Sequence, residues 1–365
     1  MDRQASGLDF AVIGHQDSWP NIQSLINVMR TSSLEQLPVE KIREVYDYIP
    51  PRGIFRMHVT SPLGMTRSGL YIETFIAPDK LTAAHLRDNI RKVREAVAVA
   101  HRLGIPMVIL GGFTSLLLEG RVDDFDEYNL ALTTGNTLTA AYVLKGIEQA
   151  CGLMGRELTE SRMMIIGATG DIGIGCTHYL KGKVKELLLC ARNRARLERL
   201  GSQLEREGHR VRWSADIREL SGEADLIISV ASSSGIEVGT LNDGVIICDA
   251  GYPKNLDMRL KDRPGVFLFH GGMGQLHHGY RFDPDYTEGF YRYPAPHLGH
   301  GCIIEIILLA FEDRMENYTI GKGNITEEKI EEMYSLSLKH GITLAPFYNA
   351  DGIWPTLKQK PHEKR

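Results

Sequence analysis

One stretch of the sequence, residues 162–180 (RMMIIGATGDIGIGCTHYL), constrains the fold more than any other. Four apolar residues at 163–166 are typical of a short buried strand, glycines follow, and residues 172–180 can continue as a helix. Glycine suits a tight turn from strand into helix because it accepts unusual backbone angles and lets a bound group approach the main chain. The free N–H groups at the start of such a helix favour the phosphates of a dinucleotide. On its own, this glycine spacing also fits a purely structural turn.

A second apolar run at residues 187–190 completes a strand–helix–strand unit of about 30 residues, the size of a dinucleotide-binding unit. An NAD site usually ends this second strand with an acidic residue that holds the ribose 2′-hydroxyl. Here residues 191–196 read ARNRAR, with no carboxylate and up to three guanidinium groups. Because guanidinium groups suit a 2′-phosphate, the sequence predicts NADPH rather than NADH. The alternative is that Arg194 and Arg196 belong only to the basic first turn of an exposed helix.

Three later apolar runs, at residues 225–230, 245–249 and 266–269, are each followed by small residues or glycine. This pattern is typical of the carboxyl edge of a doubly wound sheet, where cofactors lie. The residues predicted to contact the cofactor come from the glycine turn, the arginine segment and the ends of two of these runs: Gly167, Thr169, Gly170, Asp171, Ile172, Gly173, Arg192, Asn193, Arg196, Ala231 and Gly251. Lys254, in the motif GYPKN on the same edge, could polarise a substrate carbonyl or be an exposed turn lysine.

The rest of the chain alternates strand-like and helix-like segments. Strand-like segments include 9–14, 54–60, 69–77 and 107–110, and helix-like segments include 81–103, 138–153, 302–316 and 325–338. We therefore predict an α/β protein with a Rossmann-like doubly wound parallel sheet, an N-terminal α/β domain and a C-terminal helical segment. The predicted boundaries are 1–155 for the N-terminal substrate and cleft domain, 156–283 for the NADPH-binding domain and 284–365 for the C-terminal segment.

Composition narrows the functional classes. With 365 residues, of which 43% are hydrophobic and 24% charged, the chain is typical of a soluble globular protein of two or three domains. A formal net charge of −4 argues against general nucleic-acid binding. Five cysteines without a CxxC pair suit a reducing cytosol, not a disulfide framework. The N-terminus lacks an apolar signal core, and the apolar run at 302–311 is too short to cross a bilayer, so we expect a cytoplasmic protein without a transmembrane segment and leave peripheral membrane contact open.

The motif TTGNT at residues 133–137 precedes one of the predicted helices and has two interpretations. Small polar residues at the start of a helix can cap its free N–H groups. Alternatively, Thr133, Thr134 and Asn136 line the floor of a cleft beside the nicotinamide. Composition alone favours the cap.

Cys302 is the candidate nucleophile. Gly299 and Gly301 put it near the first turn of its predicted helix, where the dipole is expected to stabilise a thiolate and lower the pKa of the thiol. His297 and His300 lie just upstream and could supply a base or a positive charge. The other four cysteines lie in apolar segments, where cysteine is usually a small buried hydrophobe. The isoleucines that follow Cys302 leave this second interpretation open for it as well.

A thiol beside a nicotinamide has a specific use. It can accept an acyl group from a thioester, and hydride can then reduce the bound acyl group to an aldehyde. Thiolate attack conserves the energy of the thioester, so no ATP site is needed, and the sequence has no GxxxxGK[ST] loop. A metal site is the rival interpretation of the histidines at 270, 277, 278, 297 and 300, but none has a ligand spacing such as HExxH, so no metal is predicted.

Several motifs in the same order along the chain resemble the aldehyde-forming long-chain acyl-[acyl-carrier-protein] reductases of cyanobacterial alkane synthesis. The motifs are LGGFTSLL (110–117), TTGNT, GATGDIG with the following ELLLCARN, DAGYPKN (249–255), and GKGNIT (321–326) with SLKHG. The resemblance implies NADPH-dependent reduction of a fatty acyl thioester, carried by acyl-carrier protein or coenzyme A, to a fatty aldehyde through an acyl-cysteine. The family pattern Cys-x-x-Glu matches Cys302 and Glu305. An enzyme that consumes the aldehyde is the further partner that such a product implies.

In the predicted mechanism, Cys302 attacks the thioester, and the candidate oxyanion donors are backbone N–H groups at the helix start, then His300, then Lys254. The main alternative is an NADP-dependent dehydrogenase of the shikimate-dehydrogenase type, which would act on a small polar ketone or alcohol without a nucleophilic cysteine. A non-enzymatic alternative is a sensor that binds NADP(H).

Overall fold

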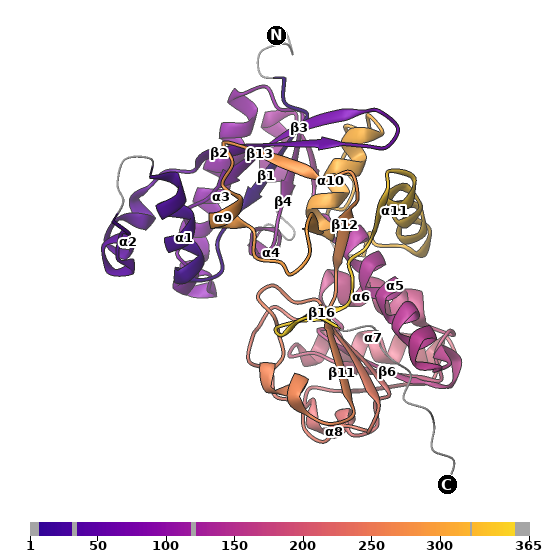
Figure 1. The fold of residues 1–365 in the computed structure, drawn as a ribbon. Coiled ribbons are helices and arrows are strands. Elements are labelled where there is room, and N and C mark those ends of the chain that lie inside the picture. The colour runs from indigo at the N-terminus through magenta and orange to yellow at the C-terminus, as the bar shows by residue number, and fades with distance from the viewer. Residues whose placement is uncertain (1–6, 31–34, 118–121, 322, 355–365) are drawn as a thin grey trace. The chain divides into compact units, whose positions relative to one another are not determined.

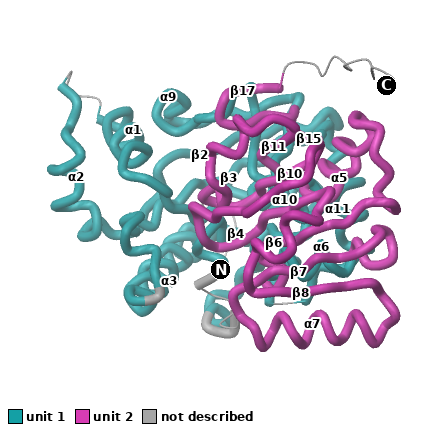
Figure 2. Tube along the Cα trace, turned by 90° about the horizontal axis from the view of Figure 1, so that it is seen from below, with its two compact units in different colours: residues 1–142, 170–178, 272–343 teal, residues 143–169, 179–271, 344–365 magenta. Residues whose placement is uncertain are grey.

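The computed structural model describes residues 7–30, 35–117, 122–321 and 323–354 of the chain (Figure 1). The chain divides into two compact units, which Figure 2 colours separately. Unit 1 comprises residues 1–142, 170–178 and 272–343, and unit 2 comprises residues 143–169, 179–271 and 344–365. This division differs from the three consecutive domains predicted at 1–155, 156–283 and 284–365, because most of the C-terminal segment packs with the N-terminal residues.

Unit 1 contains a mixed six-stranded sheet in the order β13-β2-β3-β1-β4-β5. The strands are β1 (Phe10–Gly14), β2 (Arg52–Thr60), β3 (Thr66–Glu73), β4 (Met107–Leu110), β5 (Ala131–Thr133) and β13 (Tyr280–Asp283). Strand β1 pairs in parallel with β3 and β4, and β4 pairs in parallel with β5. The antiparallel partner of β2 on its outer side is β13, which draws the C-terminal part of the chain into this unit.

Helix α3 (Leu86–Arg102) forms much of the core of unit 1, as its amphipathic pattern predicted. It buries Val93 and Val97 completely, in one cluster with Ile13 of β1 and Val108 of β4. Burying an aliphatic side chain of this size stabilises the fold by about 1.5–3 kcal/mol.

The described part of unit 1 has six further helices that lie wholly within it. They are α1 (Trp19–Met29), α2 (Val39–Val45), α4 (Phe113–Leu117), α9 (Thr287–Phe290), α10 (Gly301–Phe311) and α11 (Glu327–Lys339). Helix α10 ends at Phe311 rather than at residue 316, because Asp313 adopts a left-handed φ of +54°. Helix α11 begins as predicted, with the Thr326 hydroxyl accepting the N–H of Lys329 at 3.3 Å.

A small sheet, β14-β12-β15, precedes and follows helix α10 along the chain. Its strands are β12 (Met273–Leu276), β14 (Leu298–His300) and β15 (Ile342–Leu344). Strand β14 leads directly into α10, so the pairing of β12 with β14 fixes the start of that helix. The predicted helical C-terminal segment therefore also contains strands.

Unit 2 is built on a parallel six-stranded sheet in the order β11-β10-β9-β6-β7-β8. The strands are β6 (Arg162–Ile166), β7 (Glu186–Cys190), β8 (Val211–Ser214), β9 (Leu226–Ser229), β10 (Val245–Asp249) and β11 (Val266–His270). Two crossovers run in opposite directions from β6, so the strand order reverses between β6 and β9. This is the doubly wound Rossmann arrangement, and the predicted fold class is confirmed.

The helices of the second half of the fold connect these strands. They are α5 (Asn136–Met154) and α6 (Asp171–Leu180), which contribute residues to both units, and α7 (Arg194–Arg206) and α8 (Arg218–Ser221). A C-terminal hairpin of β16 (Tyr348–Asn349) and β17 (Gly352–Ile353) contacts β11. Every helix in the described part of the chain is too short or too polar to cross a bilayer.

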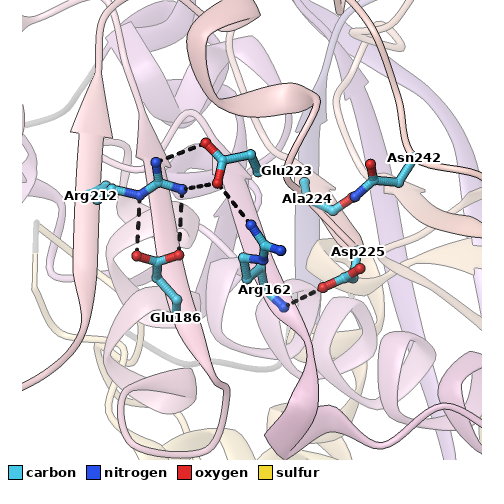
Figure 3. Close-up of polar contacts among 7 residues, drawn as sticks. All are labelled: Arg162, Glu186, Arg212, Glu223, Ala224, Asp225 and Asn242. Carbon is cyan, nitrogen blue, oxygen red and sulfur yellow. Dashed lines mark hydrogen bonds and ion pairs between the residues drawn. The ribbon is translucent and has the colours of Figure 1, made fainter.

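A network of ion pairs joins the amino ends of the strands in unit 2 (Figure 3). The Arg212 guanidinium donates to Glu186 at 3.2 Å and to Glu223 at 2.8 Å, and Arg162 also donates to Glu223 at 2.8 Å. The backbone N–H of Arg162 donates to Asp225 at 2.9 Å. These ion pairs tie the strands together at their amino ends. The predicted cofactor residues lie at the opposite, carboxyl ends of the strands.

Candidate active site

The glycine-rich turn follows β6 at the carboxyl edge of the unit 2 sheet. Gly167 has a left-handed φ of +90°, and a Cβ there would lie 2.8 Å from the backbone of Val230 and Ala231. The N–H groups of Gly167 and Ala168 both donate to the carbonyl of Cys190, at 2.9 and 3.1 Å, which ties the end of β6 to the end of β7. Thr169 completes the turn, and α6 then begins at Asp171. The close approach of two backbones therefore requires glycine at position 167.

Two buried polar side chains organise the neighbouring loops. The Asp249 carboxylate, at the end of β10, accepts the N–H groups of Gly251, Asn255 and Leu256 at 2.9–3.2 Å. Asn255 is fully buried, and its Nδ2 donates to the carbonyl of Ala231 at 2.8 Å while its Oδ1 accepts the Ala231 N–H at 2.8 Å. Together with the contact between Gly167 and Ala231, these bonds place the predicted residues Gly167, Ala231 and Gly251 close to one another.

The arginine segment lies beside Ala231. The Arg192 guanidinium donates to the hydroxyl of Ser232, one residue past Ala231, at 3.1 Å. Asn193 accepts the N–H of Arg196 at 3.0 Å, so its side chain caps helix α7. Arg192 and Arg196 are both exposed, which leaves their guanidinium groups accessible to an anion.

In unit 1, the starts of three helices meet. The Asn136 amide, at the start of α5, donates to the Asp171 carboxylate, at the start of α6, at 2.9 Å. Gly135 has a φ of +71° and lies against Cys302 near the start of α10, where a Cβ on residue 135 would approach the Cβ and carbonyl oxygen of Cys302 to 2.5 Å. A Cβ on Gly301 would lie 2.8 Å from the Cα of Thr139. The helix that follows the glycine motif and the helix that carries the cysteine are thus joined through TTGNT.

Cys302 is the second residue of α10 and is half-buried, whereas the other four cysteines are buried. The backbone N–H groups of Gly112, Cys302 and Ile303 act to lower the pKa of its thiol. Donors of this kind stabilise a thiolate, or an oxygen anion formed beside it, more than they stabilise the neutral thiol.

The expectation that the helix start lowers the pKa of Cys302 is wrong. Burial raises the pKa of the thiol to about 12, and the nearby Glu305 carboxylate acts in the same direction. The three N–H donors oppose this shift, but desolvation outweighs them. The resting cysteine is therefore a protonated thiol at neutral pH, and its attack on a carbonyl requires a group that takes the proton.

Glu305 lies one helical turn beyond Cys302 and is fully buried. Its carboxylate accepts the hydroxyls of Thr133 at 2.5 Å and Thr319 at 2.8 Å, and the backbone N–H of Leu138 at 2.9 Å. Leu138 is in the first turn of α5, so Glu305 caps that helix from α10. Burial raises the pKa of Glu305, with these hydrogen bonds opposing the shift.

The other predicted catalytic side chains have their own partners. His300 lies immediately before α10, and its Nε2 is 2.6 Å from the hydroxyl of Tyr293. His297 packs edge-on against the ring of Tyr280, with ring centroids 5.3 Å apart. Lys254 belongs to unit 2, where its Nζ donates to the carbonyl of Asp249 at 3.2 Å and burial lowers its pKa. Lys254 is therefore half-buried and hydrogen-bonded, and not a fully exposed turn residue.

Sequence reasoning missed several residues that shape this site. Asp249, Asn255 and Gly135 were present in the quoted motifs. The contacts of Asn255 with Ala231 and of Gly135 with Cys302 join segments far apart in the sequence, whereas Asp249 bonds the turn that directly follows it. Gly175 was also missed, although a Cβ there would lie 2.6 Å from the side chain of Ile325. Among the described residues, no group of three or more His, Cys, Asp or Glu side chains is arranged to hold a metal ion.

Comparison with known families and sequences gives three findings. Residues 149–270 match the family described as Shikimate / quinate 5-dehydrogenase. Over 344 residues, the chain is 31% identical to the long-chain acyl-[acyl-carrier-protein] reductase of Synechococcus elongatus, covering 91% of this chain and 97% of that one. It is also 24% identical over 292 residues to the aminotransferase PigE of a Serratia species, covering 79% of this chain and 34% of that one.

Solved structures give more distant similarities. The shikimate 5-dehydrogenase of Listeria monocytogenes, solved with shikimate and NAD, is 13% identical with a TM-score of 0.36, over 73% of this chain and 86% of that one. The L-tryptophan dehydrogenase of Nostoc punctiforme is 15% identical with a TM-score of 0.36, over 75% of this chain and 68% of that one.

Proposed function

Because the chain belongs to the long-chain acyl-[acyl-carrier-protein] reductase family, we propose that it reduces a fatty acyl thioester to a fatty aldehyde with NADPH, through an acyl group bound to Cys302. The observation that carries this proposal is the place of Cys302, the half-buried cysteine, in the first turn of α10, where backbone N–H groups favour the thiolate over the thiol. A merely structural cysteine needs no such donors. The thioester carrier is an acyl-carrier protein or coenzyme A.

In the proposed reaction, the sulfur of Cys302 attacks the carbonyl carbon of the thioester. A new carbon–sulfur bond forms, the bond to the carrier sulfur breaks, and the carrier leaves as a thiol with the proton that Cys302 has lost. NADPH, when bound, supplies the hydride that displaces Cys302 from the acyl carbon, so that thioester, NADPH and one proton yield aldehyde, carrier thiol and NADP⁺. The sulfur of Cys302 then takes up a proton and is ready to react again.

Because the pKa of the Cys302 thiol is about 12, deprotonation is a distinct requirement of this mechanism. His300 is the proposed base, since it lies two residues before the cysteine and is already oriented by the hydroxyl of Tyr293. The oxyanion of the attack is stabilised by backbone N–H groups at the start of α10, with His300 and Lys254 as further candidates.

The residues of the carboxyl edge fit a dinucleotide phosphate. The turn at Gly167 leaves no room for a side chain, and α6 begins at Asp171, so the positive end of a helix dipole follows the turn. Arg192, hydrogen-bonded to Ser232, is the proposed partner of the 2′-phosphate, which makes NADPH the cofactor. The proposed contacts are the predicted set of the glycine turn with Arg192, Asn193, Arg196, Ala231 and Gly251.

Intact-protein mass spectrometry tests the proposal directly. The protein is incubated without NADPH with acyl-carrier-protein and coenzyme A thioesters of several chain lengths. We expect an adduct with the mass of the acyl group, absent in the Cys302→Ala variant and removed when NADPH is added. Wild-type protein that reduces the thioesters at a full rate without ever forming an adduct would contradict the acyl-cysteine.

A second candidate function rests on the match of residues 149–270 to the Shikimate / quinate 5-dehydrogenase family. This function is the NADP-dependent oxidation or reduction of a small polar alcohol or ketone, and it needs no nucleophilic cysteine. Full activity of Cys302→Ala would favour it. An aldehyde-consuming partner enzyme and a cytoplasmic location complete the first proposal.

A further inference from the structure

A side-chain hydrogen bond in unit 2 joins the ends of the two strands that flank the glycine turn. Strand β6, which leads into Gly167, lies between β7 and β9 in the sheet. Arg192 lies two residues after β7, and Ser232 lies three residues after β9. The Arg192 guanidinium donates to the Ser232 hydroxyl at 3.1 Å. This bond therefore links the carboxyl ends of β7 and β9, on either side of the strand that carries the proposed phosphate turn.

Buried groups fix the loop that carries Ser232. The Nδ2 of Asn255 donates to the carbonyls of Ala231 and Ser233, both at 2.8 Å, and its Oδ1 accepts the N–H of Ala231 at 2.8 Å. These bonds hold the residues on both sides of Ser232. Asn255 is fully buried, and its own N–H donates to the Asp249 carboxylate at 3.0 Å. The backbone at Ser232 is therefore fixed from the core, although the residue itself is exposed.

The pair of side chains offers hydrogen-bond donors to a ligand. A serine hydroxyl that accepts a hydrogen bond still has its own proton to donate, and a guanidinium group has further N–H donors beside the one that Ser232 accepts. Arg192 and Ser232 are both exposed, so these donors are accessible to an anion. Hydrogen bonds to a charged acceptor such as a phosphate are stronger than those to a neutral ribose hydroxyl. The pair therefore favours a phosphate over a hydroxyl at the same position.

Building on the proposed contact between Arg192 and the 2′-phosphate, we propose that Ser232 is a second residue of that subsite and helps to determine the preference for NADPH over NADH. Its oxygen holds the guanidinium in place, and its own O–H donates to the phosphate. Recognition of the 2′-phosphate then depends on the loop after β9 as well as on the arginine segment after β7.

The test compares Ser232→Ala, which lacks the hydroxyl, with Ser232→Thr, which keeps it. Ser234→Ala, at another exposed serine of the same loop, is the matched control. The readout is the Kd of NADPH and of NADH, measured by nicotinamide fluorescence without any acyl thioester. The two cofactors differ only in the 2′-phosphate, so their comparison separates loss of a phosphate contact from a general disturbance of the loop. Thermal unfolding checks that each variant folds.

We expect Ser232→Ala to raise the Kd of NADPH about tenfold, the effect of losing a hydrogen bond to a charged group, and to leave the Kd of NADH unchanged. Ser232→Thr should keep most of the affinity for NADPH, and Ser234→Ala should bind both cofactors as the wild type does. Equal weakening of both cofactors in Ser232→Ala would overturn the proposal, because it would show that the serine only maintains the loop. Unchanged or tighter binding of NADPH would also overturn it.

The same measurement on Arg192→Ala separates this inference from the contact on which it rests. Weaker NADPH binding in Arg192→Ala but not in Ser232→Ala would overturn the role of the serine and keep that of the arginine. Unchanged NADPH binding in Arg192→Ala would overturn both. Cofactor binding is measured without acyl transfer, so a failure of the proposed reaction would appear separately, as a missing acyl adduct in the wild type.

Discussion

Gly135 and Cys302 occupy a space that admits no side chain on residue 135, because a Cβ there would lie 2.5 Å from the Cβ and carbonyl oxygen of the cysteine. Residue 135 also has a φ of +71°, which residues other than glycine rarely adopt. The motif TTGNT therefore does more than cap a helix. Its glycine allows the start of α10 to approach the start of α5 at the proposed nucleophile.

Gly135→Ala should accordingly displace Cys302 and lower the rate of acyl-adduct formation about 100-fold, the usual effect of a 1 Å misplacement of a reacting group. Stability should also fall, because the left-handed conformation alone costs of order 1–3 kcal/mol for other residues. The matched control is Gly104→Ala, since Gly104 has a φ of +68° but nothing within 4 Å of its Cβ position. Rapid adduct formation in Gly135→Ala would contradict the predicted displacement.

Arg192→Ala tests the 2′-phosphate contact. A hydrogen bond to a charged group contributes about 1.5–3 kcal/mol, so KM for NADPH should rise roughly 10- to 100-fold while KM for NADH changes little. Steady-state kinetics with both cofactors measure the ratio. Arg194→Ala, at the adjacent exposed arginine, is the control and should keep the preference for NADPH. An unchanged cofactor preference in Arg192→Ala would mean that another residue holds the 2′-phosphate.

Local sequence patterns were sufficient to predict the nucleotide-binding part of the fold. The apolar run and glycines predicted β6, the turn and α6, which the structure places at Arg162–Ile166 and Asp171–Leu180. Strand β8, with the sequence VRWS, was not predicted because it is short and half-buried, and its main support is pairing with β7. Strand β13 was missed for a similar reason, since it depends on β2 from much earlier in the chain.

The candidate site shows the same limit more clearly. Motifs alone led to Cys302 and to the edge residues near Gly167, whose roles stay predictions, and the family resemblance is confirmed. The pKa of Cys302 could not be predicted from the sequence, because its desolvation depends on tertiary packing. The capping of α5 by Glu305 joins residues 167 positions apart, and no local pattern encodes such a contact.

A buried carboxyl in unit 1, Glu73, predicts an unusual dependence of stability on pH. Its side chain accepts hydrogen bonds from Gln16 at 3.0 Å and Tyr71 at 2.9 Å, but burial dominates and raises its pKa above the ordinary value of 4.5. Between the ordinary pKa of the unfolded state and the raised pKa of the folded state, the folded state binds more protons than the unfolded state. The free energy of unfolding should therefore fall as pH rises through this range.

Glu73→Gln should remove this contribution and make the free energy of unfolding less sensitive to pH above 4.5. Urea unfolding at a series of pH values measures the slope for the variant and the wild type. Glu95→Gln, at a partly exposed position of α3, is the control for the loss of one negative charge. A steeper fall in the variant than in the wild type would reverse the predicted sign.

Glu305→Gln separates the effect of this buried carboxylate on stability from its effect on the pKa of Cys302. The amide can still accept the hydroxyls of Thr133 and Thr319 through one oxygen, but its NH₂ group then faces the N–H of Leu138. The unsatisfied donors should lower the free energy of unfolding by about 1–3 kcal/mol. Because the Glu305 carboxylate raises the pKa of the Cys302 thiol, its neutralisation should lower that pKa and speed alkylation by iodoacetamide at pH 9. We therefore expect a variant that is less stable but more reactive at Cys302. Slower alkylation in a folded variant would contradict this and show that Glu305 acts on the sulfur mainly by fixing the position of α10.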